Sequence, residues 1–68
     1  MDKTLKQKLV QKLYEYRIEN KLTLKQLSDE LNLPLTTISS WLLKANNPND
    51  IAAAELQAFL IKKGYDVR

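Results

Sequence analysis

Apolar residues recur along the chain at the three- and four-residue spacing that marks one face of an α-helix. The first such stripe is formed by Leu5, Leu9, Leu13 and Tyr16, widened by Val10 and Ile18. It predicts a helix over residues 4–19. Asn20-Lys21 is the expected break after this helix.

Two shorter apolar segments follow, separated by a tight turn at Asn32-Leu33-Pro34. Thr23 is suited to cap the first of them, because its hydroxyl can accept from an unpaired backbone N–H. Asn32 tolerates the left-handed conformation of a turn, and Pro34 disfavours helical geometry at the residue before it. The pattern therefore predicts helices over residues 24–31 and 35–43, with Pro34 at the start of the second.

A fourth helix is predicted over residues 50–63, after a loop rich in turn formers at residues 44–49. Asn49 or Asp50 can cap it, and Gly64 is placed to end it in the left-handed conformation. Its apolar stripe consists of Ala53, Leu56, Phe59 and Leu60. The tail over residues 65–68 alternates between apolar and polar residues, which is compatible with a short extended segment.

The amino-acid composition excludes several classes of functional site. The chain has 68 residues, enough for the single domain over residues 1–68 that we expect. It contains no Cys, no His and one Gly. Disulfides, the usual metal ligands and glycine-rich phosphate loops are thereby excluded, so no metal site and no cofactor are expected. No apolar run is long enough to span a bilayer, and we expect an intracellular, non-enzymatic binding module.

The net charge of +3 is concentrated at the N-terminal end. Residues 1–21 carry six basic against three acidic side chains, whereas the rest of the chain is close to neutral. Such an excess permits binding to a polyanion but is equally compatible with a solvated helix face.

The segment from Leu22 to Pro48 has the layout of a helix-turn-helix, with two short helices joined by a three-residue turn. Ser28 supplies the small residue where the helices cross, and Asn32 takes the turn position. The chain resembles the Cro/repressor-type domain (the lambda-repressor-like, xenobiotic-response-element family) over roughly residues 9–60. The resemblance rests on Lys12-Leu13-Tyr14-Glu15-Tyr16-Arg17, Lys21-Leu22-Thr23, Leu27-Ser28, Asn32-Leu33-Pro34, Thr37-Ile38-Ser39, Trp41-Leu42 and Pro48.

This resemblance implies an all-α, four-helix domain with a short C-terminal tail, and residues 34–43 as the recognition helix. It implies a sequence-specific regulator of transcription that binds double-stranded DNA, a Cro-like phage or bacterial repressor acting at the nucleoid in the cytoplasm. The expected base contacts are Leu35, Thr36, Ser39 and Ser40. The expected phosphate contacts are Lys25, Thr37, Lys44, Asn46 and Asn47.

The chain departs from the family pattern in two ways. No Arg, Lys, Gln or Asn lies between Leu33 and Leu43, so bidentate contacts to guanine or adenine are unavailable there. Leu42 stands where a Glu often pairs with the family's arginine, here Arg17, for which Glu30 is another candidate partner. We expect Arg17 and Trp41 to have structural roles, and one of the two tyrosines at positions 14 and 16 to be buried.

Two main hypotheses for the function stay open. In the first, a DNA-binding regulator gains affinity as a homodimer that forms through the fourth helix and the C-terminal tail. The tails of the two copies could pair as strands across a two-fold axis. The candidate dimer residues are Phe59, Ile61, Tyr65 and Val67. In the alternative, the apolar Leu35 and Leu43 make the chain a protein-interaction module that binds another regulator. An enzyme is a distant third reading, and no membrane partner is expected.

Overall fold

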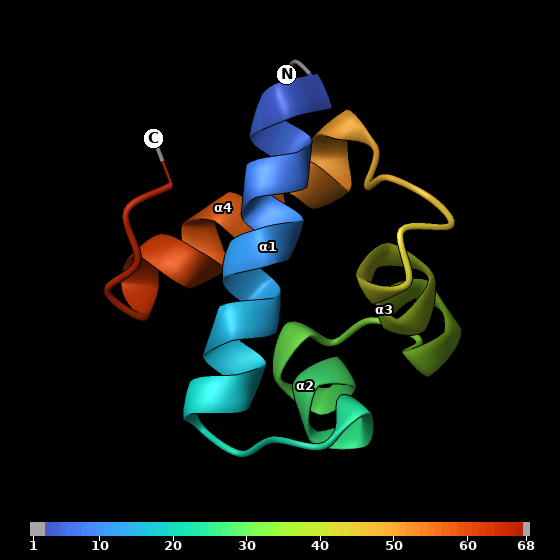
Figure 1. Cartoon of the computed structure of the whole chain (residues 1–68), viewed down its shortest axis with the longest axis vertical. Coiled ribbons are helices and arrows are strands. Elements are labelled where there is room, and N and C mark those ends of the chain that lie inside the picture. Colours follow the sequence, from blue (N-terminus) through green and yellow to red (C-terminus); the bar gives the residue numbers. More distant parts are fainter. Residues whose placement is uncertain (1–2, 68) are drawn as a thin grey trace.

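The computed structural model describes residues 3–67 and contains the four expected helices (Figure 1). They are α1 (Lys3–Glu19), α2 (Leu24–Leu31), α3 (Leu35–Leu42) and α4 (Asp50–Lys62). Each end lies within one residue of the expected one. α1 runs through the middle of the molecule and packs against α3 and α4, while α2 packs against α3 (Figure 1). None of the helices within residues 3–67 is long and apolar enough to cross a membrane.

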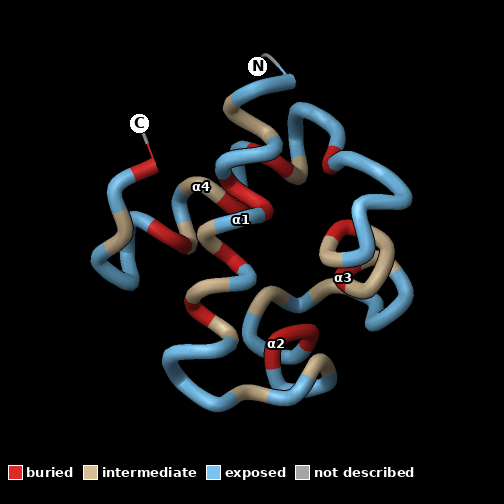
Figure 2. The backbone as a smooth tube through the Cα atoms, viewed as in Figure 1, coloured by how far each residue is buried: buried red, intermediate tan, exposed pale blue. Residues whose placement is uncertain are grey.

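The core lies where the apolar stripes of the four helices meet (Figure 2). Its buried members are Leu9, Val10, Leu13, Tyr16, Leu27, Ile38, Trp41, Ala53, Leu56, Leu60 and Val67. Trp41 is thus a core residue, and of the two candidate tyrosines Tyr16 is the buried one. The expectation for Ile18 was wrong, since this side chain is 52% exposed. It follows Leu9 by about two and a half helical turns and therefore lies on the opposite side of α1.

Local hydrogen bonds fix the helix starts. The Thr23 hydroxyl accepts from the backbone N–H of Gln26 at 3.1 Å, and the Gln26 side chain accepts from the N–H of Thr23 at 2.8 Å. This reciprocal pair is a capping box. Asn49, rather than Asp50, caps α4 by accepting from the N–H of Ala52 at 2.8 Å. Pro34 precedes α3 in an extended conformation instead of occupying its first turn.

The C-terminal tail folds back onto the helices. Gly64 turns the chain with a φ of 94°, and Val67 is completely buried. The side-chain amide of Gln57 donates to the carbonyl of Val67 at 2.9 Å. The tyrosine at position 65 donates a hydrogen bond from its hydroxyl to Glu19 of α1. No strand forms within residues 3–67, and residues 65–67 have no regular secondary structure.

This packing limits which of the candidate dimer residues are accessible to a second copy of the chain. Phe59 and Tyr65 meet the ring of Tyr16 edge-on, with ring centroids 5.4 and 6.0 Å apart. Val67 is fully buried within the chain and cannot face a partner while the tail is in this position. Val67 instead belongs to the hydrophobic core of this chain. Of the four candidates, Ile61 is the exposed one, with 41% of its surface accessible.

Candidate nucleic-acid interface

The turn between α2 and α3 sets the direction of the candidate recognition helix. Asn32 adopts the left-handed conformation, with a φ of 58°. The N–H of Leu33 donates to the carbonyl of Ser28 at 3.1 Å. In return, the buried hydroxyl of Ser28 donates to the carbonyl of Leu33. Ser28 therefore has the role expected of a small residue at the crossing, and it also ties the turn to the end of α2.

Helix α3 has an inner and an outer face. Ile38 and Trp41 point into the core, with at most 4% of either side chain exposed. Two of the expected base contacts, Leu35 and Thr36, are exposed, and the other two, Ser39 and Ser40, are half-buried. The outer face is thus the one on which the resemblance placed the base-reading side chains.

The hydroxyls on α3 have no hydrogen-bond partner among residues 3–67. Pro34 at the start of the helix gives no side-chain cap, and neither of the following threonines replaces it. Within residues 3–67, no side-chain hydrogen bond involves the hydroxyls of Thr36, Thr37, Ser39 or Ser40. These groups are therefore available to an external donor or acceptor.

A shallow cleft of about 210 Å³ lies between α3 and the loop that follows it. It is lined by Thr36, Thr37, Ser40, Trp41 and Asn46. The cleft brings two expected base contacts together with two expected phosphate contacts, over the edge of the buried tryptophan. Lys25 is exposed at the start of α2 and does not line this cleft.

Backbone hydrogen bonds tie the loop after α3 to the end of that helix, beginning with the N–H of Lys44, which donates to the carbonyl of Trp41 at 3.0 Å. The N–H groups of Ala45 and Asn46 both donate to the carbonyl of Ser40, at 2.9 and 3.4 Å. Lys44 adopts a left-handed conformation with a φ of 62°, which is uncommon for a residue other than glycine. Lys44, Asn46 and Asn47 are all exposed, so three of the expected phosphate contacts lie on a loop of defined shape.

Arg17 does not pair with Glu30. The Glu30 carboxylate instead accepts a hydrogen bond of 2.7 Å from the Tyr16 hydroxyl. Burial, together with this bond, raises the pKa of Tyr16 to about 12. The Nε atom of Arg17 is buried and has no hydrogen-bond partner among the described residues. One indication of the contact between Tyr16 and Glu30 was present in the sequence, because a buried tyrosine normally needs a hydrogen-bond partner for its hydroxyl.

Comparison with known proteins agrees with this geometry. A family model described as helix-turn-helix matches residues 13–63, which is most of the chain. The chain belongs to the helix-turn-helix family. Neither a curated protein nor a solved structure matches it. The helix-turn-helix match confirms the Cro/repressor-type resemblance and places the chain among DNA-binding regulators of transcription. It begins at Leu13, so the basic first half of α1 lies outside the matched region.

Proposed function

We propose that this chain is a sequence-specific repressor of transcription, Cro-like in size and layout, that inserts α3 into the major groove of double-stranded DNA. The observation that carries the proposal is the outer face of α3. It bears small hydroxyl side chains that make no hydrogen bond within the described part of the chain, on a helix whose direction is fixed by the turn at Asn32. Small polar groups of this kind can approach base edges closely in a groove that admits one helix.

The contacts divide into two classes. Thr36 and Ser40 donate to or accept from base edges, and Leu35 and the methyl group of Thr36 contact thymine methyl groups. Ser39, half-buried on the same helix, completes the set of base contacts. The phosphate contacts are made by the exposed or half-buried residues Lys25, Thr37, Lys44, Asn46 and Asn47. Contacts of the second class supply affinity and orientation, and those of the first supply specificity.

One copy of this surface binds weakly, because α3 carries no Arg, Lys, Gln or Asn to form a bidentate contact. We propose that two copies bind half-sites one helical turn apart, as helix-turn-helix dimers do. Ile61 on α4 is the candidate for their contact, because it is exposed, whereas Phe59 and Tyr65 are half-buried and Val67 is buried. Occupation of a promoter at the nucleoid then excludes the polymerase.

The test is fluorescence anisotropy of labelled duplex DNA across a salt series. About four phosphate contacts predict a slope near −3.6 in a log–log plot of affinity against salt. We expect Lys44→Gln to weaken binding equally on all sequences and to reduce that slope by about one unit. Ser40→Ala should instead lower affinity at particular base pairs with the slope unchanged. If neither variant changes binding, the outer face of α3 and the loop after it are not the DNA-binding surface.

A protein-interaction module is the second candidate, favoured by one observation. Leu35 and Leu43 are 46% and 77% exposed at the two ends of α3, an unusually apolar pair for a DNA-reading helix. In this reading the same face binds another regulator. Absence of duplex binding at low salt would support it and contradict the first proposal.

A further inference from the structure

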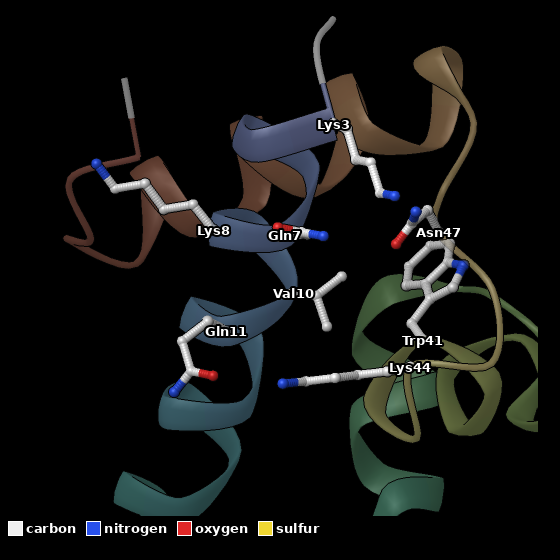
Figure 3. Close-up of a pocket in the computed structure, with 8 residues that line it drawn as sticks. All are labelled: Lys3, Gln7, Lys8, Val10, Gln11, Trp41, Lys44 and Asn47. Atoms are coloured by element: carbon white, nitrogen blue, oxygen red, sulfur yellow. The ribbon is translucent and has the colours of Figure 1, made fainter.

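A second and larger cleft, of about 570 Å³, lies between the first half of α1 and the loop after α3. From α1 it is lined by Lys3, Gln7 and Val10 among others, and from the other side by Trp41, Lys44 and Asn47. Figure 3 shows Lys3 and Gln7 directed toward Asn47 and Trp41, and Lys44 extending back toward α1. Lys8, although it borders the cleft, extends to the other side of α1 (Figure 3).

The polar lining of this cleft suits an anion. Among the described residues 3–67, all charged groups that line the cleft are ammonium groups, no carboxylate borders it, and the carboxamides of Gln7 and Asn47 add N–H donors. Lys3 and Lys44 form no ion pair within residues 3–67. On the same helix, by contrast, Lys6 pairs with Asp50 at 3.0 Å. The two ammonium groups lie at opposite ends of the cleft, that of Lys3 on the side of Asn47 and that of Lys44 on the side of Gln11 (Figure 3).

The floor of the cleft is apolar. Val10 and the ring of Trp41 are 7% and 4% exposed, so each presents a small edge to the cleft. The volume lies within the range of small-ligand sites and exceeds what a lone anion would fill. A ligand that matches both parts needs a charged end and a compact, less polar body.

We infer that this cleft binds a sugar-phosphate group. The phosphate lies at the ammonium group of Lys3 and accepts from the amides of Gln7 and Asn47, while the sugar lies against Val10 and Trp41, toward Lys44. The inference rests on the proposed function for the expected occupant, the backbone of the bound duplex. A strand that contacts Asn46 in the smaller cleft passes the same loop and the same tryptophan that border the larger one. A free phosphorylated sugar offers the same chemistry.

The first arm of the test uses duplex DNA and two variants that remove one charge each from exposed positions of α1. Lys3→Gln removes an ammonium group from the cleft, and Lys8→Gln, one that extends away from it. We expect Lys3→Gln to weaken binding on every sequence and to reduce the salt slope by about one unit. Lys8→Gln should keep a slope near that of the wild type. Equal slopes for the two variants would contradict the duplex as occupant.

The second arm uses the free chain with 2-deoxyribose 5-phosphate and, separately, inorganic phosphate. Trp41 is the single tryptophan of the chain, so its fluorescence reports on the cleft. A saturable change that Lys3→Gln abolishes and Lys8→Gln preserves supports the site, and a stronger response to the sugar phosphate than to phosphate alone supports the role of the floor.

The two arms separate this inference from the proposed function. Duplex binding with equal slopes for both variants, and no saturable change of fluorescence, overturns the inference and leaves the DNA-binding proposal standing. A saturable, Lys3-dependent change without duplex binding supports the cleft and overturns the DNA-binding proposal. Absence of both duplex binding and a fluorescence change overturns both.

Discussion

Tyr16 of α1 contacts α2, α4 and the C-terminal tail. Its hydroxyl donates to Glu30 of α2 at 2.7 Å, and its ring meets Phe59 of α4 and Tyr65 of the tail edge-on. Tyr14, two positions earlier, is 46% exposed. Sequence spacing placed Tyr16 on the apolar stripe of α1, three positions after Leu13, and its burial agrees with that placement. The contacts of its ring with α4 and the tail join segments distant in sequence and could not be predicted from the spacing.

The hydroxyl of Tyr16 can be tested separately from its ring. Tyr16→Phe keeps the ring contacts and removes the hydrogen bond to Glu30, so we expect the free energy of unfolding to fall by about 1 kcal/mol. Urea denaturation at neutral pH measures it. Tyr14→Phe is the matched control and should leave the denaturation midpoint unchanged. If both variants unfold at the wild-type midpoint, the contact with Glu30 contributes nothing to stability.

The same tyrosines predict a loss of stability in alkali. Burial and Glu30 raise the pKa of Tyr16 from 10.0 to about 12, and the hydrogen bond to Glu19, followed by burial, raises that of Tyr65 to about 12 as well. A raised pKa favours the neutral phenol in the folded state. The resulting stabilisation is complete below pH 10 and is lost as the pH rises through about 12.

Denaturation midpoints measured at a series of pH values across this window provide the check. We expect the wild type to lose stability between pH 10 and about pH 12, and Tyr16→Phe to lose less over the same range. A midpoint in the wild type that does not change across the window would show that the two phenols titrate as freely as in the unfolded chain.

At the scale of elements, the turn between α2 and α3 depends on one backbone conformation. Asn32 has a φ of 58°, in the region that costs an ordinary side chain about 1–2 kcal/mol and that Asn tolerates better. Asn32→Ala should therefore lower the free energy of unfolding by about 1 kcal/mol, whereas Asn32→Gly should stay close to the wild type. The same order should hold for duplex binding, since the turn directs α3. Equal stability of the two variants would mean that the turn can change its conformation at no cost.

The helices, caps and turn were predictable because each depends on residues close together in the sequence. Thr23 caps α2 through a residue three positions away, and Asn32 turns the chain by its own conformation. The assignments that failed are those that depend on distant partners. Glu30 was one candidate partner for Arg17, but that carboxylate accepts from Tyr16 instead. The cleft of Lys3 and Lys44 could not be predicted either, because these two residues are 41 positions apart in the chain and the basic N-terminal segment was its only sequence signal.

At the scale of the whole molecule, the packing of the C-terminal tail limits the ways in which the proposed dimer can form. The buried Val67 lies in the same cluster as Leu56 and Leu60, and Gln57 donates to its carbonyl. Pairing of two tails as strands would require this carbonyl and this side chain to leave their present contacts. The exposed part of α4 at Ile61 requires no such change, which favours it as the contact between copies.

Two variants distinguish these routes. Val67→Ala removes two buried carbons, and we expect it to lower the free energy of unfolding by about 1.5 kcal/mol at every protein concentration, because the valine belongs to the core of one chain. Ile61→Ala should leave the stability of the monomer unchanged and weaken cooperative binding to a two-fold duplex site. Urea denaturation over a range of concentrations, paired with sedimentation on DNA, measures both effects. If the effect of Val67→Ala disappears on dilution, the valine is buried between chains, and the tail rather than α4 holds the dimer together.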